Sequence, residues 1–359
     1  MRRPSRALTL PLLATLVLAA ALPAPADTLR ERLRERLQSR AASAPASNED
    51  DAEAGDMADM GGSARSAAMS CADWSRRVNR LQQRMAGRHQ GPKPDFQDQA
   101  YGPRPHQTLD VYRARGGSGP APIVLMVHGG GWCVGDKAAG GVVENKVSRW
   151  TAKGFVLVSA NYPMVADGDN ALAQARHIAR ALAHVQAHAA DWGGDPDRII
   201  LMGHSAGAHL VSLVNASPTL RAGEGARPVL GTVSLDAGAV DVVTQMPQVY
   251  PFLKLRYREA FGTTEAEWIA ASPFHQLAAG ASPWLGVCST QRKDDPCAQA
   301  RAYADKSRSL GIAADVLPEP MNHGAINKKL GEPGAYTDGV ERFMATLDAR
   351  VAALLGAQR

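Results

Sequence analysis

The residues best suited to chemistry lie in the segment Ile199–Val211, which reads Ile-Ile-Leu-Met-Gly-His-Ser-Ala-Gly-Ala-His-Leu-Val. An apolar run typical of a buried strand meets a Gly-x-Ser-x-Gly turn and continues into residues compatible with a helix. Ser205 stands at the apex of this turn, where Gly203 and Gly207 let the strand and the helix pass close together. The layout predicts a nucleophile elbow. A plain strand-to-helix turn is the alternative for this motif taken alone.

A second motif, His128-Gly129-Gly130-Gly131-Trp132, directly follows the apolar run Ile123–Val127. A tetrahedral intermediate of acyl transfer needs backbone N–H donors close to its oxyanion, and only glycine lets the main chain approach so closely. We expect this run to supply one half of an oxyanion hole and the N–H group of Ala206 to complete it. A simple glycine-rich loop is the alternative.

Together the two motifs resemble the esterase/lipase branch of the α/β-hydrolase family, near its acetyl-esterase and hormone-sensitive-lipase-like members. Gly135-Asp136-Lys137 and Asn161-Tyr162 also match that branch in order and spacing. The resemblance covers roughly residues 95 to 356 and implies an α/β-hydrolase fold. It also implies a catalytic triad in the chain order Ser, acid, His, so that both partners of Ser205 should follow it.

Two histidines follow Ser205 by more than a few residues. His275 precedes the late strand Trp284–Val287, which is too early for the family's order. His323 follows the last predicted strand in Met321-Asn322-His323-Gly324, which resembles the family's histidine loop. We therefore expect His323 to be the general base, with a surface-loop histidine as the alternative.

The triad acid is expected just past the strand Trp284–Val287, where the chain holds the adjacent residues Asp294 and Asp295. Asp295 is favoured because it lies nearest the start of the following helix. Asp294 stays open as the alternative, since the glycine usual early in this loop of the family is missing and the alignment can slip by one residue. The acid would orient the imidazole and stabilise the imidazolium.

Strands and helices alternate from about Phe96 onward, which predicts an α/β chain with a mainly parallel sheet flanked by helices. Thr108–Tyr112 alternates like a half-buried antiparallel strand. Residues 238 to 280 break the rhythm and predict a small insertion over the carboxyl edge of the sheet. Further strands are expected at Ile123–Val127, Phe155–Ala160, Ile199–Met202, Val229–Leu235, Trp284–Val287 and Ala313–Leu317, and helices at Ala171–Trp192, after Ser205, after Pro296 and at Tyr336–Leu355.

The 359 residues divide by composition into four segments. Residues 1–26 have a basic start, an apolar run and a small-residue cleavage site, and so predict a secretory signal peptide rather than a membrane anchor. Residues 27–70 predict a flexible spacer, 71–94 an N-terminal extension and 95–359 the catalytic domain. Removal of the signal peptide lowers the net charge from +5 to +2, which gives no support to nucleic-acid binding.

Export to an oxidising compartment, periplasmic or extracellular, predicts that the four cysteines are paired. Cys288 and Cys297 flank the expected acid loop, and a bridge between them closes a ten-residue ring. The chain-entropy estimate for such a ring is about 2.7 kcal/mol of stabilisation. Cys133, directly after the glycine run, then has Cys71 as its remaining partner.

The resemblance implies a serine hydrolase of carboxylic esters that needs no metal or organic cofactor, and the predicted signal peptide implies that it is exported. Ser205 would attack the acyl carbon, and the N–H groups of Gly130, Gly131 and Ala206 would hold the oxyanion. The same residues could cleave an aryl formamide, a feruloyl-type ester or a peptide end, and a non-catalytic binding protein on this fold is the rival from another class. An aromatic content of 5% favours a small soluble ester over an interfacial lipid. The oligomeric state stays open.

Overall fold

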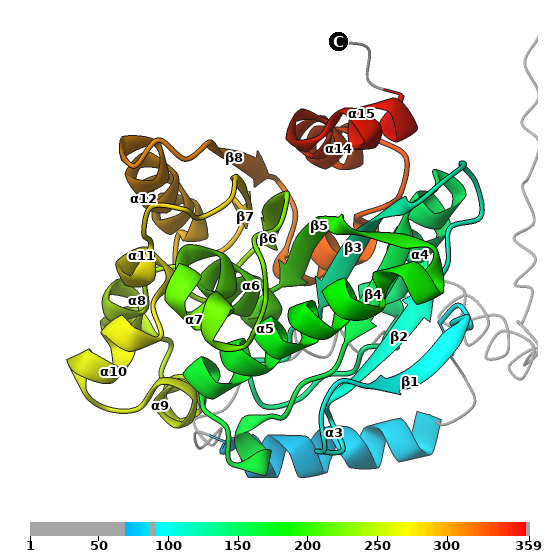
Figure 1. Ribbon diagram of the computed structural model, residues 1–359. Coiled ribbons are helices and arrows are strands. Elements are labelled where there is room, and N and C mark those ends of the chain that lie inside the picture. The colour runs from blue at the N-terminus through cyan, green and yellow to red at the C-terminus, as the bar shows by residue number, and fades with distance from the viewer. Residues whose placement is uncertain (1–68, 86–90, 357–359) are drawn as a thin grey trace, which may run out of the picture. The chain divides into compact units, whose positions relative to one another are not determined.

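The computed structural model describes residues 69–85 and 91–356 (Figure 1). The predicted signal peptide, residues 1–26, and nearly all of the predicted spacer, residues 27–70, lie outside the described residues. Both therefore stay predictions. None of the described helices combines the length and the apolar character that a membrane crossing would require.

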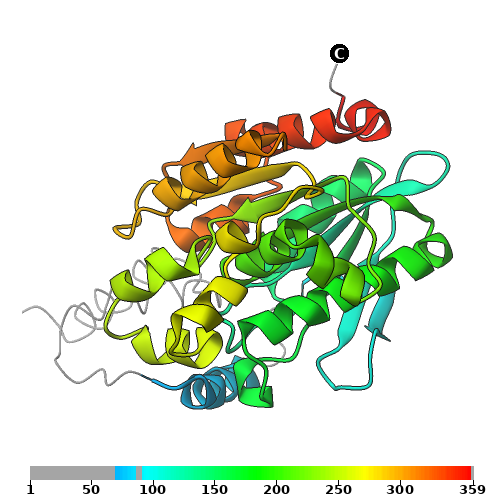
Figure 2. The same cartoon turned by 60° about the vertical axis from the view of Figure 1, so that its left-hand side comes forward.

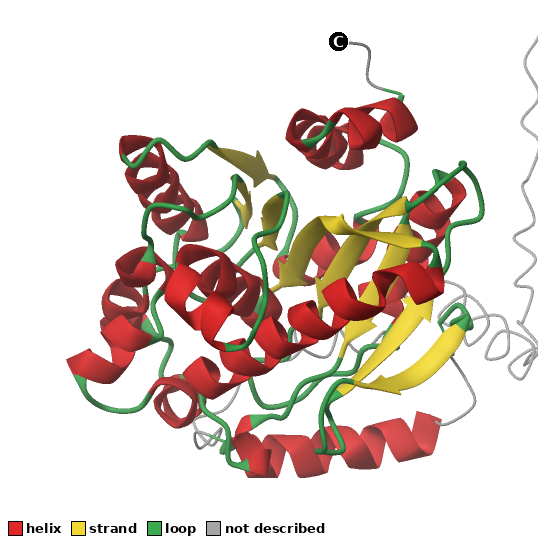
Figure 3. Cartoon of the chain, viewed as in Figure 1, coloured by secondary structure: helices red, strands yellow, loops and turns green. Residues whose placement is uncertain are grey.

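An eight-stranded sheet forms the centre of the described chain (Figure 3). Its strands lie in the order β1-β2-β4-β3-β5-β6-β7-β8. The pairs β1–β2 and β2–β4 are antiparallel, and every pair from β4 to β8 is parallel, which confirms the predicted α/β class. The strands are β1 (Phe96–Ala100), β2 (Thr108–Tyr112), β3 (Ala121–Val127), β4 (Val156–Ala160), β5 (Gly194–His204), β6 (Gly231–Leu235), β7 (Trp284–Ser289) and β8 (Ala314–Glu319).

Helices cover both faces of the sheet (Figure 1). The helices on one face are α5 (Ala171–His188), α6 (Ala206–Ala216) and α12 (Pro296–Ser309), with the short α7 (Pro218–Gly223) beside them. Those on the other face are α4 (Gly140–Ala152), α13 (His323–Lys329), α14 (Ala335–Leu347) and α15 (Ala349–Leu355). The single helix predicted for Tyr336–Leu355 is thus two helices, because Asp348 is extended and its carboxylate caps the start of α15.

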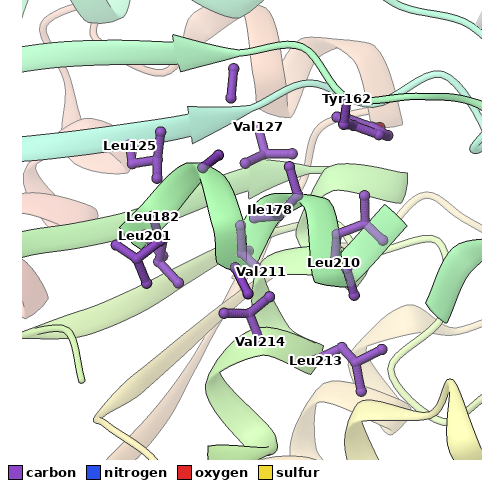
Figure 4. Close-up of a cluster of buried hydrophobic side chains, with 14 of the residues drawn as sticks. Leu125, Val127, Tyr162, Ile178, Leu182, Leu201, Leu210, Val211, Leu213 and Val214 are labelled. Atoms are coloured by element: carbon purple, nitrogen blue, oxygen red, sulfur yellow. The ribbon is translucent and has the colours of Figure 1, made fainter. Parts of the chain in front are cut away.

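Alternate residues of the central strands supply two separate cores. On β3, Leu125 and Val127 pack toward α5, where they meet residues such as Ile178 (Figure 4). Val124 and Met126 of the same strand pack into the core under the opposite helical layer. Burial on both faces explains why these strands appear in the sequence as continuous apolar runs.

β2 departs from the predicted half-buried pattern, although its antiparallel pairing is confirmed. Four of its five residues are buried, among them Asp110, which is 1% exposed. The Nζ atom of Lys137 lies 3.1 Å from Asp110 Oδ1 and 2.7 Å from Asp98 Oδ1. A buried carboxylate is tolerated here because a buried cation faces it, and periodicity cannot indicate such a partner.

The residues between β6 and β7 form four short helices, in agreement with the predicted insertion. These are α8 (Val242–Gln248), α9 (Lys254–Phe261), α10 (Glu265–Ala270) and α11 (Pro273–Gln276). In Figure 2 they lie in yellow-green and yellow next to the blue helix α3 (Cys71–Met85). The backbone N–H of Cys71 donates to Glu259 of α9 at 2.7 Å, and Arg256 lies over the ring of Trp74.

A disulfide between Cys71 and Cys133 attaches the start of α3 to the loop after β3, as predicted from the cysteine pattern. The ring of Trp74 in α3 packs against Gly131, since a Cβ atom built on that glycine would lie 3.0 Å from the indole. The N-terminal extension therefore contacts the loop for which the sequence predicts an oxyanion hole.

Candidate active site

Ser205 occupies the turn between the end of β5 and the start of α6, so the predicted elbow is present. Its backbone is strained, with φ of 53° and ψ of −115°, a region that non-glycine residues seldom occupy. Two backbone hydrogen bonds hold it there: its N–H donates to the carbonyl of Leu235 at 3.0 Å, and its carbonyl accepts from Gly238 at 3.1 Å. The residue is 5% exposed.

The glycines on either side of Ser205 are required by close backbone contacts. A Cβ atom on Gly203 would overlap the carbonyl of Gly207, and one on Gly207 would overlap the carbonyl of Val127. A Cβ atom on Gly129 would lie 2.9 Å from Cβ of Ser205 itself. The elbow can therefore form only where β3, β5 and α6 approach with no side chain between them.

The glycine loop after β3 lies beside the nucleophile with its N–H groups available. Gly130 and Gly131 have φ values of 109° and 54°, in the region that favours glycine. Among the described residues, neither of their N–H groups donates a backbone hydrogen bond. The N–H of Ala206, the first residue of α6, likewise has no acceptor within its helix. These N–H groups are the donors that the sequence predicts for an oxyanion hole, and none of them has a backbone acceptor among the described residues.

Neighbouring side chains fix the glycine loop from below. The ring of His128 stacks on Tyr162 at 4.7 Å between centroids, and the tyrosine hydroxyl donates to the His128 carbonyl at 3.0 Å. Burial lowers the pKa of His128, so its ring stays neutral and donates through Nδ1 to the carbonyl of Gly129 at 2.7 Å. Gly135, φ 131°, leaves room for that ring.

Trp132 connects the glycine loop to the insertion. Its Nε1 donates to His209 Nδ1 at 3.2 Å, and the ring makes edge contacts with Tyr257 and Phe261 of α9. Burial lowers the pKa of His209 to about 4. The neutral ring can therefore accept from Trp132 while its Nε2 donates to the carbonyl of Ala271 at 2.7 Å.

His323 begins α13, the helix that follows β8, and is 8% exposed. Asn322 caps this helix by accepting from the N–H of Ala325 at 2.8 Å, which fixes the direction in which the imidazole leaves the backbone. Nδ1 of His323 donates to Oδ2 of Asp236 at 2.6 Å. This bond leaves Nε2 as the acceptor nitrogen. His275 is directed elsewhere, toward Ser272 and Asp241.

The carboxylate at His323 is therefore Asp236, and the sequence prediction of Asp295 is wrong. Asp295 caps the start of α12, where its Oδ1 accepts from the N–H of Ala298 at 3.1 Å and its side chain is 65% exposed. The alternative, Asp294, is also excluded, because both of its oxygens bind the guanidinium of Arg292 at 3.0 and 2.5 Å. Helix capping and an ion pair occupy the two predicted acids.

Asp236 directly follows β6 and is 0% exposed. Burial raises the pKa of this carboxyl group, but the charge of Arg292 and the hydrogen bonds from His323 and Ser289 outweigh it. They hold the pKa of Asp236 well below its usual range. The group is thus ionised and able to hold the imidazole in one tautomer.

The sequence did contain an indication of Asp236. It comes immediately after the predicted strand Val229–Leu235, and the ends of parallel strands meet at one edge of the sheet. Ser205 and His323 also follow the ends of strands in this sheet, β5 and β8. The assignment failed because two acids also follow the next strand, where the resembled family has its acid.

His204 was not predicted as part of the site. Its ring lies 4.5 Å from that of His323 between centroids, and its Nε2 donates to the His323 carbonyl at 3.0 Å. Burial first, and then the charge of His323, lower its pKa well below the usual value. Its neutral ring packs against the imidazole and connects the elbow to α13.

Among the described residues, the hydroxyl of Ser205 itself makes no hydrogen bond.

The chain is similar in sequence to known proteins. Residues 109–293, about half of the chain, match the BD-FAE family. The chain is 34% identical over 237 residues to a probable isoprenylcysteine α-carbonyl methylesterase, ICMEL1, of Arabidopsis thaliana, covering 60% of this chain and 48% of that protein. It is 28% identical over 247 residues to the probable carboxylic ester hydrolase LipM of Mycobacterium tuberculosis, covering 65% and 56%. The chain thus spans about half the length of these relatives.

Among solved structures, esterase B of Lactobacillus rhamnosis superposes with a TM-score of 0.59 at 19% identity, covering 79% of this chain and 94% of that one. An identity this low supports the fold, which is that of an α/β-hydrolase. The expected α/β-hydrolase resemblance is confirmed, and the chain belongs to the BD-FAE family.

Proposed function

We propose that this protein is a serine hydrolase of carboxylic esters, with Ser205 as nucleophile, His323 as general base and Asp236 as the acid that orients it. The observation that carries the proposal is the contact between His323 and Asp236 beside the strained elbow. The names of the relatives, a methylesterase and a carboxylic ester hydrolase, support the same reaction.

In the first half of the reaction, Oγ of Ser205 bonds to the acyl carbon while its proton passes to Nε2 of His323. The carbonyl oxygen becomes an oxyanion held by the N–H groups of Gly130, Gly131 and Ala206. The carbon–oxygen bond of the ester then breaks, and the alcohol leaves with the proton from His323. The product is an acyl-enzyme.

In the second half, water repeats the sequence in place of the serine. Its proton passes to His323, its oxygen bonds to the acyl carbon, and Ser205 leaves with the proton that the imidazole returns. Asp236 remains ionised throughout, and it stabilises the imidazolium that forms twice in each cycle.

We further propose that the protein is exported. The basic and apolar start of the chain is the sequence basis for this proposal. The two disulfides among the described residues support it, because such bonds persist in oxidising compartments. Sequencing the N-terminus of the protein recovered from the periplasm or medium tests the cleavage expected near residue 26.

The test of the activity is turnover of p-nitrophenyl esters of increasing acyl length, alongside a formanilide, a feruloyl ester and an aminoacyl anilide. Ester turnover that falls by orders of magnitude in Ser205→Ala is expected. An organophosphate should add one group, on the peptide that carries Ser205. Labelling elsewhere, or full activity in Ser205→Ala, would refute the proposal, and the panel shows which acyl bond is preferred.

A further inference from the structure

The segment from the last residue of β7 to the start of α12, residues 289–295, contacts Asp236 and the residues just before His323. A disulfide between Cys288 and Cys297 closes it at its base, as predicted from the sequence. The backbone N–H of Ser289 donates to Oδ1 of Asp236 at 2.8 Å, and its hydroxyl donates to the carbonyl of Met321 at 2.7 Å. Met321 stands two residues before His323. The segment thus contacts both the acid and the residues that precede the histidine.

Arg292, at the centre of this loop, contacts Asp236 in two ways. Its Nη1 lies 3.2 Å from Oδ2 of Asp236, the same oxygen that accepts from His323. The same Nη1 also lies 3.1 Å from the carbonyl of Ala237 and 3.4 Å from that of Asp236. The guanidinium therefore contacts both the carboxylate and the backbone of the residue that carries it.

The backbone at Asp236 needs such support. Its φ is 46°, a left-handed conformation that costs a non-glycine residue free energy and persists only where neighbours hold it. The guanidinium of Arg292 holds this turn by binding two backbone carbonyls, those of Asp236 and Ala237. The backbone N–H of Asp236 adds a hydrogen bond to the carbonyl of Val287 at 2.8 Å.

Arg292 is itself held in place. Asp294 accepts two parallel hydrogen bonds from it, from Nε at 3.0 Å and from Nη2 at 2.5 Å. Such a fork fixes the plane of the guanidinium. The Arg292 side chain is 16% exposed and that of Asp294 is 8% exposed, so water competes little for these contacts.

We propose that Arg292 is a positioning residue for the reaction: it holds Asp236 in the rotamer and charge state in which that carboxylate orients His323. The inference rests on the proposed function. The loop in which the sequence predicts the acid thus supplies a cation that aligns the acid at the end of the neighbouring strand β6.

Other charged or titratable groups also act on this centre. Those that face Asp236 are His323 of α13, His204 at the end of β5, Tyr336 of α14 and Arg292. Those that face Arg292 are Asp236, Asp294, Tyr257 of α9 and Tyr250 before it. Among these groups, Arg292 is the cation that takes no part in proton transfer. Its removal therefore takes a positive charge away from the imidazolium and favours the protonated form of His323.

The test compares Arg292→Met, Arg292→Lys and the control Arg301→Met, an exposed arginine on α12 whose nearest acid is Asp295 at 3.8 Å. With a p-nitrophenyl ester, Arg292→Met should lower kcat by about 10- to 100-fold, the cost of a misaligned catalytic group. KM should change little. The low-pH limb of kcat/KM should move to higher pH by at least about 0.5 unit, because the imidazolium loses a nearby positive charge.

Arg292→Lys keeps the charge without the fork, so the pH limb should return toward its wild-type position while kcat recovers only in part. Arg301→Met should leave both unchanged. If Arg292→Met folds poorly, Asp294→Asn is the milder variant to measure. It keeps the guanidinium but removes its orienting partner. We expect kcat to fall, while the low-pH limb of kcat/KM moves less than in Arg292→Met.

If Arg292 serves only to stabilise the fold, Arg292→Met should melt at a lower temperature. Its kcat, counted per active site titrated with a phosphonate, and the low-pH limb of its kcat/KM should then be unaltered. That outcome overturns the inference. It stays distinct from failure of the proposed function, which is decided by Ser205→Ala alone.

Discussion

Asp236 accepts a 2.6 Å hydrogen bond from Nδ1 of His323, although 87 residues separate the two along the chain. The bond forms because Asp236 directly follows β6 and His323 follows β8, and all parallel strands end at the same edge of the sheet. β6 is also the neighbour of β5, the strand that ends at Ser205. The acid, the base and the elbow are therefore gathered by topology.

The first prediction concerns the identity of the acid. Asp236→Asn should lower kcat by about 10⁴-fold, because the amide cannot hold the imidazole in its reactive tautomer. Asp295→Asn is the matched control and should keep wild-type kcat, since its carboxylate is exposed and caps α12. The reverse pattern in ester turnover would return the assignment to the loop after β7.

The elbow and the glycine loop could be predicted from sequence because local backbone geometry demands particular residues there. Gly207 must be glycine where α6 crosses the end of β3, and that need appears in the sequence itself. His323 was also predictable, because few histidines follow the elbow and only one follows the last strand.

The acid could not be predicted in the same way, because it depends on which strand end approaches α13. In the second half of the chain, Asp236, Asp294 and Asp295 all follow strands, and only their surroundings in the fold distinguish them. Asp236 is buried beside Arg292, whereas Asp295 caps a helix. Long-range pairs of this kind leave no local pattern. The buried pair of Asp110 and Lys137 is a second example.

A second prediction uses the low pKa of Asp236. A carboxyl group whose pKa is lower in the folded protein stabilises it at pH values above its unfolded pKa, about 3.9, and the stabilisation is lost as the pH falls through the folded value. Wild type should therefore lose on the order of 2 kcal/mol between pH 5 and pH 2 that Asp236→Asn does not lose. Urea unfolding across this range measures the difference. Parallel curves for the two proteins would contradict it.

A third prediction tests the packing under the elbow. Gly207→Ala should destabilise the protein by about 1–3 kcal/mol, because the added methyl group overlaps the carbonyl of Val127. Gly223→Ala at the end of α7 is the control, since nothing lies within 4 Å of its Cβ position. Thermal melts should separate the two variants clearly, and equal melting temperatures would show that β3 and α6 can move apart.

A fourth prediction concerns the N-terminal helix. Trp74→Ala removes the ring that packs on Gly131, so the oxyanion donors should become less well aligned. We expect kcat to fall by about tenfold with a smaller change in KM. Arg76→Ala, an exposed residue of the same helix, should behave as wild type. A rise in KM with unchanged kcat would instead mean that Trp74 contacts the substrate.

The last prediction links the second disulfide to the acid. Cys288→Ser with Cys297→Ser opens the ring that holds the loop of Arg292, at a cost of about 2.7 kcal/mol in the chain-entropy estimate. The fold should remain, because a ten-residue ring constrains the unfolded chain less than a long one. The free-energy cost in kcat should exceed the loss in the free energy of unfolding, because residues 289–295 contact Asp236 through both Ser289 and Arg292.

The measurement is a double-mutant cycle between the disulfide pair and Arg292→Met, read in kcat at a temperature where every variant is folded. If the bridge acts by holding Arg292, removal of both should cost little more than removal of Arg292 alone, because groups that act as a unit are not additive. Independent, additive losses would show that the bridge reaches the site by another route. A disulfide variant that melts far lower yet keeps full kcat would show that the bridge serves stability alone, and that Arg292 holds Asp236 without a closed loop.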